Sequence, residues 1–516
     1  MTATLLRGGR ALLGGSVVDA DLVLVGSEFA HVGPAGSAPP ADRVLELQGA
    51  LVLPAFVDGH VHVTDTGLAL TGLDLSTVRS KAQLLDAVAA RTTQLHGRPI
   101  LGHGWDETTW EDATVPTAAE LDRASYGSVV YLSRVDVHSA LASSALMVSV
   151  PGLGTVDGHH PEGWLRRAAH HAVREAALGS LTAGQRMAAQ SHMLRHAASL
   201  GIGSVHEMNG PQIGGYDDVR QLQSLVAEGG LPDVVVYWGQ TAADGGLEHV
   251  RDLGAHGAGG DLFVDGALGS RTACLRSPYR DEAGASGALY LDADAIADHL
   301  VRCTLAGVQA GFHVIGDAAM DAVIDGLQSA ATTLDPERIR AAGHRLEHAE
   351  MLDEQQISVL ADLAVVASVQ PAFDAAWGGE DGMYADRLGA DRGTGLNPFS
   401  AMAGAGIALV LGSDAPVTPL DPWGAVRAAV LHRTPSQRLD LRSALDSHTR
   451  TGHAAVGDPA SGRLETGAPA TYAVWTADFD QTGWPDLSTG ASPTCLRTVV
   501  RGSTVHDSGQ LEEVAA

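Results

Sequence analysis

The sequence of 516 residues has little positive charge for its size. Lysine and arginine together number 33, against 61 aspartate and glutamate residues, which gives a formal net charge of −28 at pH 7, and Lys81 is the single lysine. An acidic surface repels nucleic-acid phosphates and anionic lipid headgroups. We therefore expect a neutral or cationic small-molecule substrate, and neither nucleic acid nor a membrane as a partner.

Cysteines and long hydrophobic runs are also scarce. The three cysteines are far apart and form no Cys-x-x-Cys motif, so neither a disulfide framework nor a thiolate zinc site is predicted. No apolar run reaches the roughly 18 residues of a membrane span. The sequence has no phosphate-binding glycine loop and no Gly-x-Ser-x-Gly motif. These absences disfavour kinases, esterases and membrane proteins, and we expect a cytoplasmic protein.

The composition nevertheless suits a large folded protein, because 45% of the residues are hydrophobic and only 18% are charged. Apolar strand-like runs alternate with helical stretches, which is typical of an α/β fold with parallel strands. Eight such strands favour a TIM-like (β/α)8 barrel. They are predicted at residues 55–59, 202–206, 234–237, 262–264, 308–312, 345–347, 365–369 and 408–411.

Both ends of the chain contain short strands separated by glycine and proline. We predict that residues 1–54 and 456–516 form one small β-sandwich domain, and that residues 55–455 form the barrel. The stretch from about 66 to 200, after the first barrel strand, is too long for one helix and is predicted to be a large insertion. It would cover the active site if it lies at the catalytic end of the barrel; the alternative is an insertion unrelated to the substrate.

Chemically active side chains follow several of the predicted strands. His60 and His62 follow the first strand, His313 the fifth, His348 the sixth and Asp414 the eighth. The carboxyl ends of barrel strands meet at one rim, and the alternation of a strand lets His60 and His62 point the same way. Imidazole nitrogens and a carboxylate at one rim indicate a divalent metal, with zinc expected. The alternative is a set of unrelated histidines and a turn aspartate.

Several segments also carry a family resemblance, and they span nearly the whole chain. They are residues 53–62, 102–106, 134–139, 264–273, 313–319, 345–349, 412–417 and 462–467. Together these segments resemble the metal-dependent amidohydrolase superfamily, and within it amidohydrolase family 3, the branch that includes N-substituted formamide deformylase.

The resemblance implies a TIM-like metallohydrolase with a β-sandwich built from both termini. It implies His60 and His62 as ligands of a first metal, and Asp414 as a metal ligand and proton shuttle. His313 and His348 are implied as ligands of a second metal or as substrate contacts, so the implied catalytic residues are Asp414 and His348.

One position departs from the family pattern. Many relatives place a lysine four residues before the Asp-Gly of the fourth strand, where it is carboxylated and bridges two metals; here that residue is Asp261. Lys81 lies in the insertion, so no carboxylated lysine is expected. Asp261 or Glu207 supplies a shorter bridge between two ions, or the site holds one ion. We slightly favour one ion, bound by His60, His62, His313 and Asp414, because an aspartate has less reach than a carboxylated lysine.

Four further residues are predicted to bind the substrate: His138, Trp105, Asp265 and Arg271. Their structural alternatives are the core of the insertion for Trp105, and an Arg-Asp pair that holds a loop for Asp265 and Arg271.

We expect hydrolysis of a non-peptide C–N bond, in a substituted amide or formamide, by metal-activated water. The alternatives are a hydrolytic deaminase of a heterocycle and a catalytically silent barrel that binds a ligand. Association into a homodimer is left open.

Overall fold

The computed structural model describes residues 2–95, 98–135, 137, 139–481, 483–488 and 490–515. The chain divides into two compact units, which we call the barrel unit (residues 1–62 and 194–516) and the inserted unit (residues 63–193). Each unit is described separately below.

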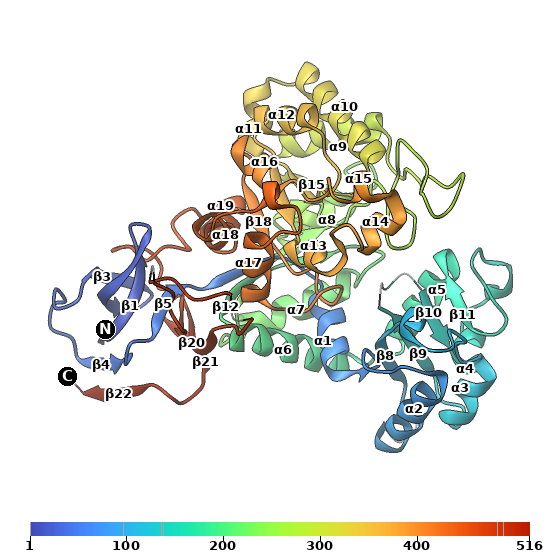
Figure 1. Ribbon diagram of the computed structural model, residues 1–516, viewed down its shortest axis with the longest axis horizontal. Helices are drawn as coiled ribbons and strands as arrows, with labels where there is room; N and C mark the ends of the chain where they lie inside the picture. The colour runs from blue at the N-terminus through green and yellow to red at the C-terminus, as the bar shows by residue number, and fades with distance from the viewer. Residues whose placement is uncertain are drawn as a thin grey trace. The chain divides into compact units, whose positions relative to one another are not determined.

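The centre of the barrel unit is a parallel sheet, which has eight strands within the described residues (Figure 1). Neighbouring strands pair in chain order, and a bridge between Val61 and Ala415 links the segment after the last strand back to the first strand. The predicted barrel is therefore confirmed, and it is nearly closed. Its strands are β6 (Phe56–Val61), β12 (Ile202–Asn209), β13 (Asp233–Trp238), β14 (Gly257–Ala258), β15 (Gln309–Val314), β16 (Arg345–His348), β17 (Val366–Val369) and β18 (Leu409–Leu411).

Most of these strands are buried along their whole length, as expected for a parallel sheet that is covered on both faces. Helices connect them and follow the last strand. They are α7 (Tyr216–Ala227), α8 (Gly246–Leu253), α9 (Ala293–Ala306), α10 (Asp317–Thr333), α11 (Pro336–Ala342), α12 (Glu354–Asp362), α13 (Pro371–Trp377), α14 (Met383–Leu388), α15 (Ala390–Gly393), α16 (Phe399–Gly404), α17 (Pro422–Val430), η3 (Pro435–Gln437), α18 (Leu441–Ser447) and α19 (Arg450–Ala455).

The fourth barrel strand was predicted in the wrong place. We expected it at residues 262–264, but β14 ends at Ala258, and only a single bridge, between Phe263 and His313, lies further on. The reason is a pair of glycines after β14. Gly260 has a φ of 78°, and a Cβ atom on Gly259 would lie 2.3 Å from the Gly311 nitrogen. The chain turns there, and Asp261 follows the turn.

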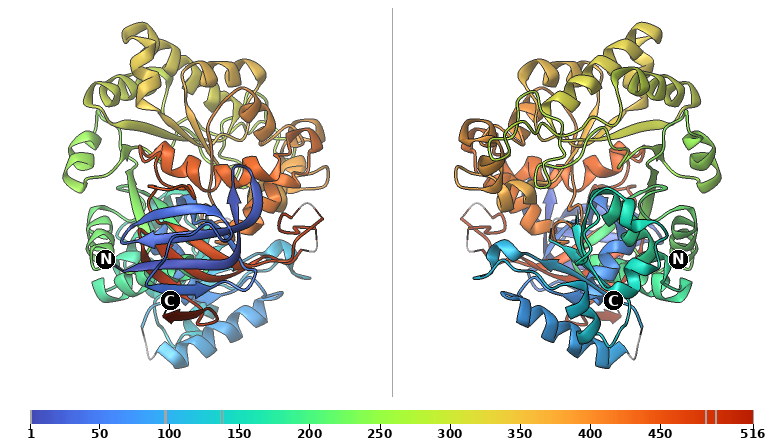
Figure 2. Two further views of the ribbon diagram at one scale, coloured as in Figure 1. Left: turned by 90° about the vertical axis from the view of Figure 1, so that its left-hand side faces the viewer. Right: turned by 90° about the vertical axis from the view of Figure 1, so that its right-hand side faces the viewer.

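Both ends of the chain contribute to a second sheet, which has nine strands in the part of the chain that is described (Figures 1 and 2). β19 pairs with β5 and so joins the C-terminal strands to the N-terminal ones, as predicted. Phe29, Val52 and Tyr472 lie in the hydrophobic core of this sheet. The strands are β1 (Ala3–Leu13), β2 (Ser16–Val25), β3 (Glu28–Pro34), β4 (Arg43–Glu46), β5 (Leu51–Pro54), β19 (Tyr472–Thr476), β20 (Thr494–Val500), β21 (Ser503–Asp507) and β22 (Glu512–Ala515).

The inserted unit has its own sheet, in which the described strands follow the order β11-β10-β9-β8-β7. Two hydrophobic clusters form its core, one around Trp105 and Leu132 and one around Leu165 and Val173. The strands are β7 (Leu73–Asp74), β8 (Ile100–Trp105), β9 (Val130–Arg134), β10 (Ser139–Ala142) and β11 (Trp164–Arg166). The helices are α1 (Val63–Thr71), α2 (Lys81–Leu95), η1 (Glu107–Thr109), α3 (Ala118–Ala124), α4 (Ser144–Val148), η2 (Leu153–Thr155) and α5 (Arg167–Gly179), followed by α6 (Ala183–Ser199).

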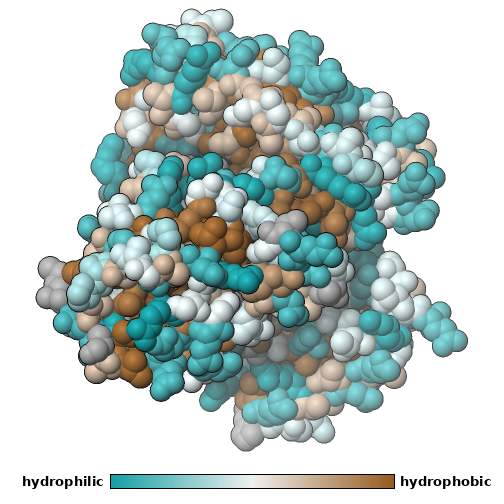
Figure 3. Space-filling model, turned by 60° about the vertical axis from the view of Figure 1, so that its left-hand side comes forward, coloured by the Kyte–Doolittle hydropathy of each residue, from teal (hydrophilic) through white to brown (hydrophobic). Residues whose placement is uncertain are grey.

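Eleven large hydrophobic side chains are exposed in the described residues. The most exposed ones in the described residues, Tyr126 and Val148, are each 84% accessible and stand apart in the sequence. On the face drawn in Figure 3, hydrophilic residues are widespread and hydrophobic residues show in smaller groups between them. Among the helices of the described residues, none has both the length and the apolar character needed to cross a membrane.

Candidate metal centre

The structure brings the predicted histidines and aspartates together at the carboxyl ends of the barrel strands. Asp414 Oδ1 lies 3.3 Å from His60 Nε2 and 3.2 Å from His62 Nε2. Asp261 lies among all four imidazoles. Its Oδ2 is 3.2 Å from His62 Nε2, and its Oδ1 is 3.6 Å from His60 Nε2. The same Oδ1 is 3.4 Å from Nδ1 of His313 and 3.7 Å from Nε2 of His348.

Hydrogen bonds connect the segment after the last barrel strand to the first barrel strand beside the centre. The Asp414 N–H donates to the His60 carbonyl at 2.7 Å, and the Ser413 N–H donates to the buried carboxylate of Asp58 at 2.9 Å. Asp414 and His348 have φ values of 53° and 69°. Such left-handed conformations are unfavourable for residues with side chains and tend to cluster at functional sites.

Each of the four imidazoles has one ring nitrogen bonded to an oxygen away from the two aspartates. For His60 and His62, Nδ1 lies 2.9 Å from Glu347 Oε2 and from the Met208 carbonyl, respectively.

The same pattern holds for the other two histidines. His348 Nδ1 lies 2.8 Å from Gln370 Oε1, and His313 Nε2 lies 3.3 Å from the Gly266 carbonyl. Because carbonyl and carboxylate oxygens only accept, these four nitrogens carry the hydrogen. The other nitrogen of each ring faces Asp261 or Asp414, and in a neutral imidazole that nitrogen carries the lone pair that binds a cation.

This donor set fits a divalent metal. His60 Nε2 is buried and has no hydrogen-bond partner in the described part of the chain. Two groups of potential ligand atoms converge there, His60 with His62 and Asp414, and His60 with Asp261 and His348. Zinc bonds of about 2.0–2.1 Å to nitrogen and oxygen place neighbouring tetrahedral ligands about 3.4 Å apart. The imidazole nitrogens and carboxylate oxygens are 3.2–3.7 Å apart, a spacing that suits ligands of one divalent cation.

The charges of the centre favour a cation as well. Burial lowers the pKa of His62, but hydrogen bonds to Asp261 and Asp414 outweigh burial and raise the pKa to about 10. Burial raises the pKa of Asp414, but His60 and His62 hold that pKa below its usual range. Two adjacent carboxylates in a buried site therefore stabilise positive charge between them, which a metal supplies as well as protons do.

The sequence did not point to the residues that support the ligands: Asp58, Arg345, Glu347 and Gln370. Two of them adjoin predicted ligands within the same motifs, because Glu347 precedes His348 and Asp58 lies two residues before His60. The sequence did carry one signal for Arg345 and Glu347: both are charged residues within a predicted barrel strand, and a buried charge needs a partner.

Three other predicted residues lie in the barrel unit. Glu207 is buried, accepts a hydrogen bond from Asn209 at 2.8 Å, and belongs to neither group of converging ligand atoms in the described residues. Asp265 is fully buried, and its two carboxylate oxygens accept the N–H groups of three residues at 2.8–2.9 Å: Cys274, Ile315 and Gly316. Arg271 pairs with Asp281 at 2.8 Å and not with Asp265. Asp265 therefore braces two loops beside the centre.

The remaining predictions fell in the inserted unit. Trp105 was predicted to contact the substrate, but it is fully buried in the core and its Nε1–H donates to the Leu132 carbonyl at 2.8 Å. An indole that packs this way has no surface left for a ligand. His138 lies outside the described residues.

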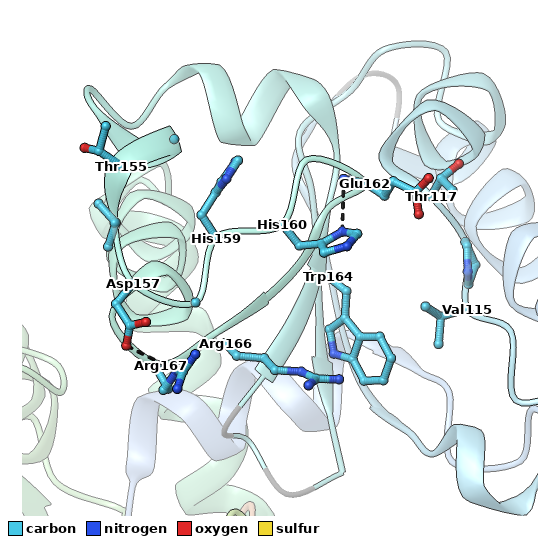
Figure 4. A pocket seen from close by; sticks show the side chains of 14 residues that line it. Val115, Thr117, Thr155, Asp157, His159, His160, Glu162, Trp164, Arg166 and Arg167 are labelled. Carbon is cyan, nitrogen blue, oxygen red and sulfur yellow. Dashed lines mark hydrogen bonds and ion pairs between the residues drawn. The ribbon is translucent and has the colours of Figure 1, made fainter.

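A cavity of about 670 Å³ lies within the inserted unit (Figure 4). It is lined by residues 115–117 and 154–160 and by Glu162, Trp164, Arg166 and Arg167. The Arg166 guanidinium lies 4.1 Å from the Trp164 ring, and exposed Arg167 and Asp157 pair at 3.2 Å. None of the predicted site residues that the structure describes lines it. The candidate catalytic site is therefore the metal centre of the barrel unit, not this cavity.

Comparison with known proteins agrees with this site. Residues 43–506 match the model of the amidohydrolase family. The chain is 27% identical over 498 residues to the protein LONG AFTER FAR-RED 3 of Arabidopsis thaliana, covering 90% of this chain and 83% of that one. It is 23% identical over 497 residues to N-substituted formamide deformylase of Arthrobacter pascens, covering 86% of each.

Among solved structures, a metal-dependent hydrolase from Pyrococcus furiosus aligns with a TM-score of 0.75 and 26% identity. The alignment covers 92% of this chain and 99% of that chain. The likeness to the deformylase is distant, whereas the family match spans most of the sequence. The chain therefore belongs to the amidohydrolase family, within family 3, and is a metal-dependent hydrolase of that superfamily.

Proposed function

We propose that the protein hydrolyses a C–N bond outside peptides, in a substituted amide or a formamide. The observation that carries this proposal is that three buried imidazoles and the partly buried His62 each donate one N–H outward and turn the other nitrogen towards Asp261 or Asp414. These groups lie at the end of the barrel where enzymes of this fold carry their chemistry. The distant likeness to N-substituted formamide deformylase supports an amide or formamide as the substrate.

In this proposal one divalent cation, with zinc expected, is held by His60, His62, Asp261 and Asp414. Asp261 stands where the family resemblance leads one to expect a carboxylated lysine, and its position among the four imidazoles favours it over Glu207. When bound, such a cation would polarise the scissile carbonyl group and make water a stronger nucleophile at neutral pH.

The chain's own residues would move the proton and hold the substrate. Asp414, an acceptor-only carboxylate, would take the proton from the attacking water and return it to the leaving nitrogen. His348 has its Nδ1–H fixed by Gln370, so its Nε2 accepts either a proton or a cation. When protonated, Nε2 would donate to the carbonyl oxygen of the substrate. When Nε2 is unprotonated, His348 would instead hold a second cation together with His313 and Asp261.

The test combines metal analysis with a substrate screen. We expect about one equivalent of zinc per chain. The active protein should release formate from N-substituted formamides, a carboxylate from acyl amides, or a carbamate from cyclic ureas. A chelator should abolish the activity, and zinc or manganese should restore it. Two equivalents would place a second cation at His313 and His348.

Other outcomes contradict the proposal. Ammonia release from heterocyclic amines, with no formate or acid from the amides, would indicate a deaminase. A folded, metal-free and inactive protein that still binds a ligand would indicate a silent barrel.

A further inference from the structure

A charged pair lies inside the barrel, where apolar branched side chains usually fill the space. Arg345 and Glu347 both project from β16, and neither has any accessible surface. Arg345 Nε donates to Glu347 Oε1 at 2.7 Å, and Nη2 donates to Oε2 at 3.1 Å. The guanidinium also donates to Ser368 Oγ at 2.8 Å and to the Gly59 carbonyl. The position of the Glu347 carboxylate is therefore fixed from one side by several hydrogen bonds.

The other side of this carboxylate faces the candidate metal centre. Glu347 Oε2 accepts the Nδ1–H of His60 at 2.9 Å, and neither side chain is accessible to solvent. His60 belongs to both groups of converging ligand atoms, and its buried Nε2 has no hydrogen-bond partner in the described residues. A chain of contacts thus runs from Arg345 through Glu347 to the nitrogen at the middle of the centre.

Glu347 differs from the other groups that hold the imidazoles from outside. His62 and His313 donate to backbone carbonyls, and His348 donates to an amide oxygen, whereas His60 donates to a carboxylate. A neutral imidazole carries one N–H, so an acceptor at Nδ1 selects the form whose Nε2 is free to bind a cation. A carboxylate acceptor also makes that Nε2 more basic than a carbonyl does.

We propose that Glu347, held in place by Arg345, is a positioning residue that fixes the tautomer and ring orientation of His60 for cation binding. The inference rests on the proposed metal site and deepens it. It assigns the buried pair a role in metal affinity, apart from any role in stability.

The test must separate metal affinity from folding. Removing Glu347 alone would leave the Arg345 charge buried without a partner, which destabilises proteins strongly, whereas replacing both members of a buried pair is often tolerated. We therefore compare two double variants, Arg345→Met with Glu347→Leu, and Arg345→Met with Glu347→Gln. The glutamine retains an oxygen that can accept from His60 Nδ1, and the leucine does not.

The measurement is the affinity of the metal-free protein for Zn²⁺, by competition with a chromophoric chelator, together with the thermal midpoint of the metal-free protein. Loss of the acceptor in the Leu variant should weaken zinc binding by about 10–100-fold. The Gln variant should stay within about threefold of the wild type. The two variants should melt at similar temperatures.

Asp374→Asn is the matched control, because Asp374 is a buried carboxylate 3.6 Å from His432 Nδ1, and neither residue belongs to the metal centre. It should leave zinc affinity unchanged.

Two results would overturn the inference: wild-type zinc affinity in the Leu variant, or equal weakening in the Leu and Gln variants. If the double variants do not fold, Glu347→Asp decides, because it keeps the charge beside Arg345 but shortens the side chain. It should weaken zinc binding at least about tenfold, and unchanged affinity would again overturn the inference. Failure of the wild type to bind Zn²⁺ would instead contradict the proposed metal site itself.

Discussion

Two groups of histidines in the barrel unit differ in where their ring nitrogens point. In the core, His299 Nδ1 accepts the Ala242 N–H at 2.9 Å and Nε2 donates to the Ala258 carbonyl at 3.0 Å. His344 likewise accepts the Ala310 N–H at 3.0 Å and contacts a threonine hydroxyl at 2.9 Å. Both nitrogens of these core rings are used within the protein.

The rim histidines, His60, His62, His313 and His348, are held through one nitrogen and turn the other towards Asp261 and Asp414. Burial does not separate the two groups, because His60 and His299 are both almost fully inaccessible. The difference is that one ring nitrogen of each rim histidine faces a carboxylate, where a cation or a proton can bind, whereas the core rings use both nitrogens within the protein. That difference distinguishes a candidate ligand from a structural histidine, and the following predictions test it.

The largest effect is expected for Asp414→Asn, which removes the proposed proton carrier at the rim. We expect kcat to fall by about 10²–10⁴-fold, the usual contribution of a general acid–base group. The assay is turnover of the substrate found by the screen, with zinc content measured on the same sample. Wild-type kcat in this variant would exclude Asp414 as the proton shuttle.

A core histidine should show the opposite behaviour. His299→Leu leaves the Ala242 N–H and the Ala258 carbonyl without their partner, and should destabilise the protein by about 2–4 kcal/mol. Zinc content should not change. Urea denaturation and metal analysis check both parts, and His299→Gln, which retains a donor and an acceptor, serves as the control. If His299→Leu lost zinc without losing stability, His299 would be a metal ligand and the division into core and rim histidines would be wrong.

Acid should destabilise the protein through the core histidines. Burial lowers the pKa of His344 to about 4, below the value of about 6.5 in unfolded chains. The unfolded state therefore binds the proton more readily, so the stability contributed by neutral His344 is complete above pH 6.5 and is lost as the pH falls towards 4. The loss at pH 5 is about 2 kcal/mol.

His344→Gln should flatten this part of the pH profile. The measurement is the urea midpoint between pH 7 and pH 5, for the variant and the wild type. Parallel profiles would mean that His344 does not titrate as its burial implies.

The smallest effect is expected in the inserted unit. Lys81 Nζ lies 3.1 Å from Glu120 Oε1 in a partly exposed pair, which contributes about 0–1 kcal/mol. Lys81→Gln should change the thermal midpoint little and leave zinc content and turnover as they are, with or without bicarbonate. If the zinc content of the wild type depends on bicarbonate and that dependence disappears in the variant, Lys81 is carboxylated and contributes to metal binding.

The positions of most strands and of the rim residues could be predicted because both depend on local pattern. Apolar runs that alternate with helical periods predict the barrel, and residues that directly follow such runs must lie at its rim. The fourth strand was misplaced because Gly259 and Gly260 interrupt it, and sequence propensity favoured the apolar residues beyond them. Trp105 was misassigned because an indole suits a core and a binding site equally well.

The sequence alone determined the fold class, the family resemblance, and the histidines and aspartate at the ends of the strands. Only the tertiary structure decided that Asp261 stands among four imidazoles, that Glu347 rather than a backbone carbonyl holds His60, and that Asp265 braces loops. Hydrogen bonds such as that between Glu347 and His60 join residues 287 positions apart. Their partners depend on how strands pack side by side, which no local pattern of residues encodes.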